Sequence, residues 1–201
     1  MTSPTLELIR ELAGERETLK TAEIRAAGIS GQSVTRLVRA GKLERVQRGL
    51  YRLPDSPITE HHDLVNVIKV APKAIIVLIS SLRFHEIGTQ VAREVWIQLP
   101  LKAHAPRIAW PPIKIVRTSI GALLTEGVEM HRISGENIPI TCPARTVADC
   151  FKHRSQIGLE PCLEALREVL GSKRGIVSEI HHYAKLNRVA KVMQPYLEGM
   201  V

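Results

Sequence analysis

Two short helical patterns separated by a tight turn are the feature that most constrains the fold of this chain. The first is expected over residues 22–27, with Thr21 as its N-cap and Gly28 just after its last turn. The second is expected over residues 32–40, with Ser30 as its N-cap. Two helices joined by a short turn that contains glycine have the spacing of a helix-turn-helix. The N-terminal region is therefore expected to contain this motif.

After Gly41 the residues alternate with a period of two, which is typical of β-strands. Residues 43–48 and 50–53 form two such runs, and Gly49 between them supplies the turn of a β-hairpin. A further helix, over residues 4–13, precedes the helix-turn-helix. Helix, turn, helix and hairpin in this order predict a winged helix.

Two prolines, Pro54 and Pro57, enclose a polar pair and predict an extended linker. We therefore expect a winged helix-turn-helix domain over residues 1–55 and a second domain over residues 58–201. The second domain groups its strands in the middle and its helices at the end, which predicts a mixed α+β domain with a helical C-terminal third. The expected strands are 74–79, 95–99, 113–116, 128–133 and 138–140, and the expected helices are 59–71, 82–87, 144–151, 159–170, 177–186 and 190–197.

The charge of the chain favours a polyanionic partner, since 28 Lys+Arg oppose 20 Asp+Glu and the formal net charge is +8. A run of arginines is often only a solvated face. Here, six basic residues against one acidic residue fall between positions 32 and 52, on the two elements that a winged helix presents to double-stranded DNA. The residues expected to contact DNA are Gln32, Ser33, Thr35, Arg36, Arg39, Lys42, Arg45, Arg48 and Arg52.

Composition argues against two other kinds of partner. Aromatic residues make up only 3% of the chain, so a surface that stacks unpaired bases is poorly supplied. No apolar run approaches the roughly 18 residues that a membrane span needs, and the N-terminus carries charges where a signal peptide has an apolar core. We expect a cytoplasmic protein without a membrane partner.

The sequence gives no strong sign of catalysis or metal binding. Ser80 and Ser81 precede His85 by about one helical turn, but no G-x-S-x-G motif surrounds them, and we interpret a serine here as the N-cap of the helix at 82–87. The adjacent histidines at 61–62 and 181–182 lack metal-ligand spacing. We expect no enzyme activity, no metal and no cofactor.

Several polar or reactive residues of the second domain are expected to be structural. Cys142, Cys150 and Cys162 form no C-x-x-C pair and are expected to be buried thiols. Arg145 and Asp149 are four residues apart in an expected helix, which favours an i,i+4 ion pair.

The chain resembles the AbiEi family of antitoxins from type IV toxin-antitoxin systems. The stretches that carry the resemblance are residues 26–30, 37–46, 48–54, 80–85 and 142–149. The resemblance implies an N-terminal winged helix that binds inverted repeats in the operon's own promoter and represses it. It implies a C-terminal domain that opposes a nucleotidyltransferase-like toxin without forming a stable complex with it. The DNA-contacting basic residues of the family correspond to Arg36, Arg39, Arg45 and Arg48.

Two other functions remain open at the level of sequence. The chain could be a stand-alone winged-helix transcription factor whose C-terminal domain senses a ligand or a partner. It could also be a DNA nuclease, although the carboxylate cluster of a metal-dependent nuclease is missing from the sequence pattern.

Overall fold

The computed structural model describes residues 3–14, 16–56, 59–172 and 176–200, and the chain divides into two compact units. The N-terminal unit is formed by Met1–Pro72, Arg107–Pro111 and Arg132–Asn137. The C-terminal unit is formed by Lys73–Pro106, Pro112–His131 and Ile138–Val201. Pro57 of the expected linker lies outside the described residues, and the domain boundary at 55–58 stays a prediction.

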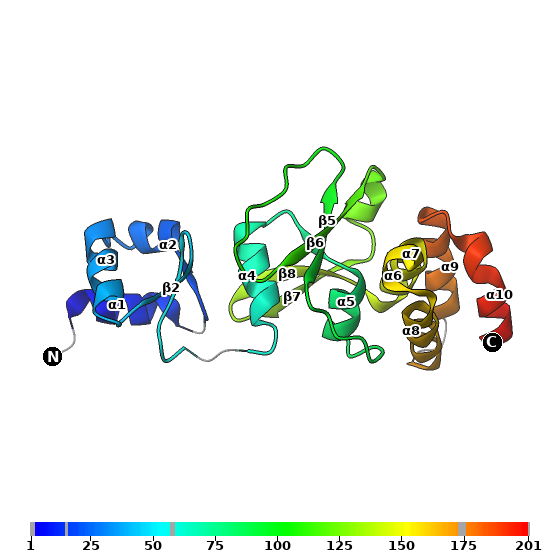
Figure 1. The fold of residues 1–201 in the computed structure, drawn as a ribbon, viewed down its shortest axis with the longest axis horizontal. Helices are drawn as coiled ribbons and strands as arrows, with labels where there is room; N and C mark the ends of the chain where they lie inside the picture. Colours follow the sequence, from blue (N-terminus) through cyan, green and yellow to red (C-terminus); the bar gives the residue numbers. More distant parts are fainter. Residues whose placement is uncertain (1–2, 15, 57–58, 173–175, 201) are drawn as a thin grey trace. The chain divides into compact units, whose positions relative to one another are not determined.

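The N-terminal unit combines helices with a small antiparallel sheet of strand order β1-β3-β2 (Figure 1). Its described helices are α1 (Pro4–Ala13), α2 (Thr21–Ala26), α3 (Gly31–Arg39) and α4 (His62–Val70). Its strands are β1 (Leu19–Lys20), β2 (Glu44–Gln47) and β3 (Leu50–Arg52). The expected helices and the expected hairpin are confirmed to within a few residues at each end.

One strand and one helix start differ from the sequence-based expectation. Strand β1 was not expected, because two residues are too few to show an alternating pattern. Helix α2 begins at Thr21 rather than after it, and the N–H of Lys20 at its N-cap donates to the Glu23 carboxylate at 2.6 Å. The turn of the hairpin holds Gly49 at φ +81°, a backbone conformation that favours glycine, and the Gly49 carbonyl accepts the Thr21 N–H at 2.9 Å.

Apolar side chains from α1, α2 and α3 form one buried cluster. Ile9 of α1 and Ile24 of α2 are fully buried, and Leu37 of α3 is 6% exposed. Leu43 and Leu53, which flank the hairpin strands, belong to the same cluster. The shared core fixes α3 and the hairpin relative to each other, so the side chains on their outer faces have defined positions.

A buried carboxylate connects distant parts of the N-terminal unit. Glu17, 2% exposed, accepts hydrogen bonds from the Thr59 N–H at 2.7 Å, from His62 Nδ1 at 2.8 Å and from the Ser134 hydroxyl at 3.1 Å. Burial raises the pKa of Glu17, but these hydrogen bonds outweigh it, so the pKa of the carboxyl is lowered overall. The charged Glu17 carboxylate thus links the segment that precedes α2 with the start of α4, and also with the turn at Ser134.

The C-terminal unit contains a mixed five-stranded sheet of order β6-β5-β4-β8-β7, with the remaining helices (Figure 1). The strands are β4 (Ile75–Ile76), β5 (Val95–Pro100), β6 (Ile113–Thr118), β7 (Val128–Ile133) and β8 (Glu136–Thr141). The helical elements are α5 (Leu78–Phe84), η1 (Gly121–Leu124), α6 (Pro143–Lys152), α7 (Arg154–Ile157), α8 (Leu159–Ser172), α9 (Ile176–Leu186) and α10 (Ala190–Met200). None of the described helices is both long enough and apolar enough to cross a lipid bilayer. The expected α+β class is confirmed.

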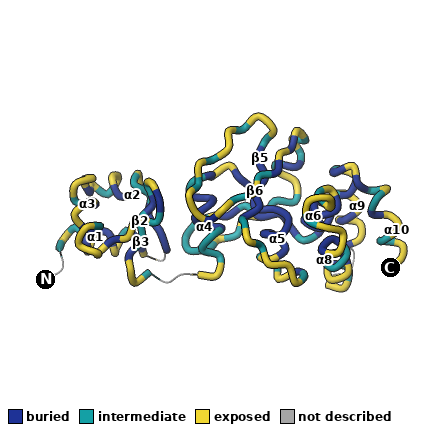
Figure 2. Tube along the Cα trace, in the orientation of Figure 1, coloured by how far each residue is buried: buried dark blue, intermediate teal, exposed yellow. Residues whose placement is uncertain are grey.

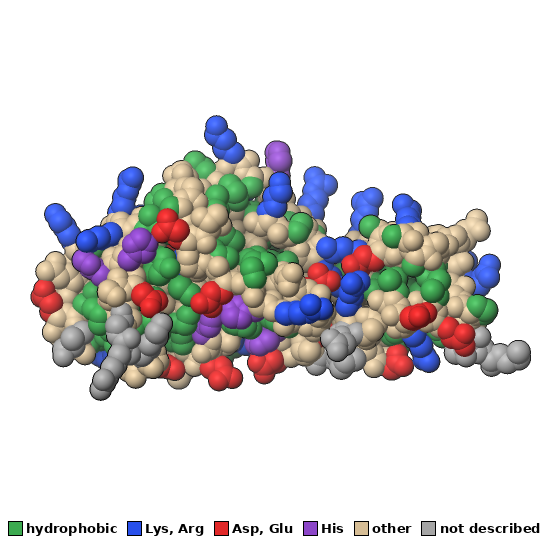
Figure 3. All heavy atoms as spheres, turned by 180° about the vertical axis from the view of Figure 1, so that it is seen from behind, with side chains coloured by type: hydrophobic (Ala, Val, Ile, Leu, Met, Phe, Trp, Pro, Cys, Tyr) green, Lys and Arg blue, Asp and Glu red, His purple; other side chains and the backbone are tan. Residues whose placement is uncertain are grey.

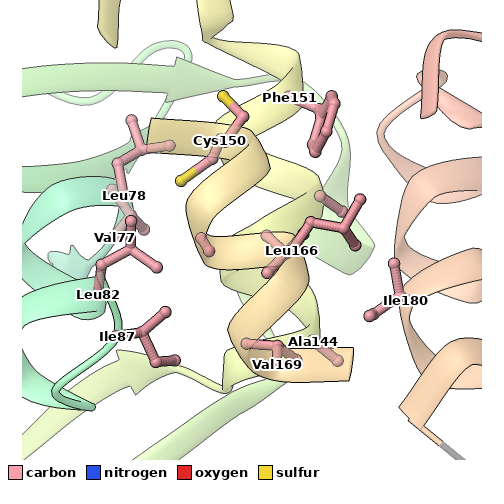
Figure 4. Packing of buried hydrophobic residues seen from close by; sticks show 14 of the residues in the cluster. Val77, Leu78, Leu82, Ile87, Ala144, Cys150, Phe151, Leu166, Val169 and Ile180 are labelled. Carbon is pink, nitrogen blue, oxygen red and sulfur yellow. The ribbon is translucent and has the colours of Figure 1, made fainter. Parts of the chain in front are cut away.

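The core of the C-terminal unit lies where α5, α6, α8 and α9 meet. Leu82 of α5, Phe151 of α6, Leu166 of α8 and Ile180 of α9 are nearly or fully buried and belong to one cluster (Figure 4). In Figure 2 the buried part of the trace also runs through the central strands and α5. The three cysteines are free and buried, as expected.

The strand expected at 74–79 is wrong over most of its length. Strand β4 is only two residues long, and the chain turns into α5 at Leu78, which has φ +53° and is fully buried. Ser80 and Ser81 therefore lie inside α5 and do not cap a helix, and α5 ends at Phe84. A short apolar run has the same appearance in a buried strand and in the first turn of a buried helix, so the sequence could not distinguish them.

Candidate nucleic-acid interface

The outer face of α3 carries several of the residues expected to contact DNA. Val34 and Leu37 of this helix are buried, which turns Gln32, Arg36 and Arg39 outward, where all three are exposed. The structure brings four of the predicted residues together around one open pocket. That pocket is lined by Gly31, Gln32, Thr35, Arg36 and Arg39.

Two predicted residues of α3 use their hydroxyl groups within the helix. The Ser33 hydroxyl lies 3.0 Å from that of Ser30, the N-cap, whose side chain also accepts the Ser33 N–H at 3.2 Å. The Thr35 hydroxyl donates to the Gly31 carbonyl at 3.0 Å. The longer side chains of Gln32, Arg36 and Arg39 are therefore the groups of this helix best placed to reach a ligand.

The hairpin and the turn before it add three exposed basic side chains and one that is paired. Lys42, Arg45 and Arg48 are exposed. Arg52 lies opposite Glu44 in the β2–β3 register, and its Nε donates to the Glu44 carboxylate at 2.6 Å. The structure thus places Arg52 in an ion pair, while the other three charges face solvent.

Removal of the Glu44 charge is expected to strengthen DNA binding. Glu44→Gln would delete the acidic residue of the hairpin and release Arg52, so the affinity for any duplex should rise several-fold at low salt and less at high salt. Fluorescence anisotropy with a labelled duplex at two salt concentrations measures this change. As a control, Glu160→Gln removes an exposed carboxylate from α8. Equal affinities of wild type and Glu44→Gln at low salt would contradict the expectation.

Net charge does not by itself identify an interface. On the face in Figure 3, Lys and Arg side chains project at many separate places and are interspersed with acidic ones. What distinguishes α3 from these scattered charges is that the side chains of Gln32, Arg36 and Arg39 all lie on one exposed face of the same helix.

Ser81 and His85, for which the sequence pattern indicated no catalytic role, converge on the same carbonyl group. The Ser81 hydroxyl donates to the Thr141 carbonyl at 2.9 Å and lies 2.8 Å from the Thr146 hydroxyl. His85 Nε2 lies 2.8 Å from the same Thr141 oxygen. Both side chains thereby attach α5 to the end of β8.

The expected ion pair between Arg145 and Asp149 is confirmed, at 3.3 Å, and it is buried. The guanidinium of Arg145 also donates to the Gln98 side chain at 2.5 Å and to the carbonyls of Leu123 and Glu126. The sequence indicated the pair but not the other partners, because these lie 19 to 47 residues away along the chain.

One cluster of potential metal ligands in the described residues was not expected from the sequence; it is made by His85, Glu129 and His131. Glu129 and His131 are two residues apart in an expected strand and so share one side of it, which was the available signal. His85 is distant in sequence, and only the tertiary structure brings it to the pair.

The N-terminal unit has the features of a helix-turn-helix type of regulator. Residues 7–54 match the family described as transcriptional regulator, AbiEi antitoxin, so the resemblance seen in the sequence is confirmed over this segment. Over its whole length the chain is similar to the crystal structure of the RV2827C protein from Mycobacterium tuberculosis, with a TM-score of 0.59 and 12% identity, covering 100% of this chain and 83% of the other. This similarity concerns the fold. No curated protein matches the sequence.

Proposed function

We propose that this protein is a DNA-binding transcriptional autorepressor and antitoxin of a type IV toxin-antitoxin system. In this proposal the N-terminal unit acts as a winged helix on inverted repeats in its own promoter. The C-terminal unit opposes a nucleotidyltransferase-like toxin in the cytoplasm without a stable complex. The family match over residues 7–54 supports the regulator class.

The observation that carries the DNA-binding part is the composition of the α3 surface. Gln32, Arg36 and Arg39 stand on one exposed helix face around an open pocket. Arginine pairs with the two acceptors of guanine and glutamine with the edge of adenine in the major groove, and both also donate to phosphates. A helix of this composition after a tight turn fits the role of recognition helix.

The hairpin would serve as the wing and contribute affinity without sequence information. Lys42, Arg45 and Arg48 are exposed and can neutralise phosphates beside the groove. Arg52 would contribute less, because Glu44 already compensates its charge. Sequence selectivity would therefore come mainly from α3, and most of the salt dependence from both elements together.

Operator binding by the purified chain is expected to be tight, sequence-selective and steeply dependent on salt. If Arg36, Arg39, Lys42, Arg45 and Arg48 each neutralise one phosphate, log affinity should fall against log salt concentration with a slope of roughly −4.5 per bound copy. The measurement is a titration of the upstream DNA across a salt series, beside a scrambled duplex of equal length. Equal affinity for both duplexes would overturn the proposed regulator.

The antitoxin part is tested separately, in cells. Expression of the neighbouring gene should arrest growth, and co-expression of this chain should restore it. A variant without operator binding should still restore growth if the C-terminal unit supplies the antitoxicity. Selective operator binding without any protection would favour the stand-alone transcription factor.

A further inference from the structure

Three side chains from two elements of the C-terminal unit converge at one place. His85 is the C-cap residue of α5, and Glu129 and His131 lie on β7. One donor atom from each lies within 4.8 Å of the other two. This is the one such group of three among the residues that the structure describes.

The strand geometry explains why two of these groups act together. Glu129 and His131 are separated by one residue, so their side chains leave β7 on the same side. The Glu129 carboxylate and His131 Nε2 are 3.2 Å apart. Two ligand atoms at about 2.1 Å from a tetrahedral zinc ion are separated by roughly 3.4 Å, so this pair already has a ligand-to-ligand spacing.

His85 is the third member of the group and offers one ring nitrogen to it. A carbonyl oxygen only accepts hydrogen bonds, so the 2.8 Å contact of His85 Nε2 with the Thr141 oxygen puts the ring proton on Nε2. The lone pair of the neutral ring is then on Nδ1, which is the nitrogen through which His85 would bind an ion. A histidine ligand that donates its other N–H to a backbone carbonyl is the usual arrangement around bound zinc.

The site is held in place and is open to solvent. The Phe84 ring packs against the His131 ring with centroids 4.6 Å apart, which restrains the imidazole. The side chains of Glu129 and His131 are 51% and 31% exposed, and β7 is the last strand in the sheet order, so an ion can enter from solution. The largest distance between two of the donor atoms is 4.8 Å at most. Bringing those atoms to the spacing of roughly 3.4 Å around a tetrahedral ion requires a movement of about 1.4 Å or less, which rotation of the side chains can supply.

We propose that His85, Glu129 and His131 form a binding site for a zinc-type divalent transition-metal ion, with a fourth position taken by water. Two imidazoles and one carboxylate suit Zn²⁺, whereas Mg²⁺ and Ca²⁺ prefer an all-oxygen set. The bound ion would fasten the C-terminal end of α5 to the end strand of the sheet. This site is separate from the α3 surface and does not depend on the proposed DNA binding.

The test is isothermal titration calorimetry, in which Zn²⁺ is titrated into the full chain free of any affinity tag. We expect one Zn²⁺ per chain for wild type, and an affinity at least about 100-fold lower for His131→Asn and for Glu129→Gln, because loss of a ligand should cost at least as much as loss of an outer-shell partner. Cobalt provides a second readout, since Co²⁺ bound by this ligand set absorbs in the visible range. The absorption should be present in wild type and absent from both variants.

The chain offers a matched control in a second exposed histidine–glutamate pair. His182 Nε2 lies 2.9 Å from the Glu126 carboxylate, but among the residues that the structure describes no third His, Cys, Asp or Glu side chain brings a donor atom within 4.8 Å of both. His182→Asn should bind zinc as wild type does. Both test substitutions affect exposed or half-exposed side chains, and thermal melts without metal establish that each variant is folded. Absence of saturable zinc binding by wild type, or binding that all three variants retain equally, would overturn the proposal.

Discussion

Replacing Arg145 by alanine is expected to lower the free energy of unfolding of the C-terminal unit by about 3 to 5 kcal/mol, the usual cost of removing one partner of a buried ion pair. Arg145 is fully buried in α6, and its guanidinium donates to four different groups. Two of them are the Asp149 carboxylate and the Gln98 side-chain oxygen. The other two are the backbone carbonyl of Leu123, within η1, and that of Glu126, just after η1. The substitution would leave all four without this donor, and most of the cost would come from Asp149, whose charge would remain buried.

The deficit of this variant should depend on pH in a defined direction. Burial raises the pKa of Asp149, while the Arg145 charge and hydrogen bonds from Arg145 and Asn187 lower it. Without Arg145, the pKa of Asp149 in the folded state rises further above its value in the unfolded chain. Folding then takes up a proton at pH values between these two pKa values, so the free energy of unfolding falls as pH rises through this range. The loss relative to wild type should therefore be largest at neutral pH and smaller near pH 4, about the pKa of an unfolded aspartate.

Urea unfolding, monitored by tryptophan fluorescence, measures the loss of stability in the C-terminal unit. Trp96 is 8% exposed in β5 of the C-terminal unit, whereas Trp110 is 58% exposed and should change little on unfolding. Arg167→Ala, at an exposed position of α8, is the matched control and should alter stability by less than about 0.5 kcal/mol. Arg145→Ala combined with Asp149→Asn should recover part of the loss and its pH dependence. A loss below about 1 kcal/mol for Arg145→Ala would show that the buried network is not stabilising.

Replacing Arg36 or Arg39 by alanine is expected to weaken operator binding by about 1 to 3 kcal/mol each, or roughly 5- to 150-fold, if the side chain binds a base edge. A residue that binds only a phosphate would instead weaken all duplexes alike and reduce the salt slope by about one unit. Both arginines are exposed on α3, so neither substitution should affect the core. The double variant should lose most of its selectivity between operator and scrambled DNA.

The measurement is the operator-to-scrambled affinity ratio at one salt concentration, together with the salt slope of each variant. Arg36→Lys and Arg39→Lys separate charge from shape, since lysine keeps the charge but lacks the planar fork that binds two acceptors. Arg167→Ala serves as the control here too, because it removes the same charge from the C-terminal unit. Wild-type operator affinity in both alanine variants would remove α3 from the DNA interface.

The local elements of the N-terminal unit could be predicted because their signals are short-range. Ser30 caps α3, Gly28 and Gly41 follow helix ends with positive φ, and Gly49 makes the hairpin turn. In the C-terminal unit, by contrast, the apolar run at 74–79 was misassigned, because both β4 and the start of α5 are buried and leave the same pattern. The helix start at Leu78 depends on how the sheet and helices pack around it.

The sequence by itself determined which residues form a basic helix face and hairpin, because helix periodicity and strand alternation place side chains on faces whatever the rest of the fold does. It also determined the Arg145–Asp149 pair, which one turn of α6 brings together. Only the tertiary structure decided which of these charges are free: Arg52 is paired through the hairpin register, and Arg145 is enclosed by groups from β5 and η1. It alone assembled His85 with β7, because the distance between groups far apart in sequence is set by packing and not by local geometry.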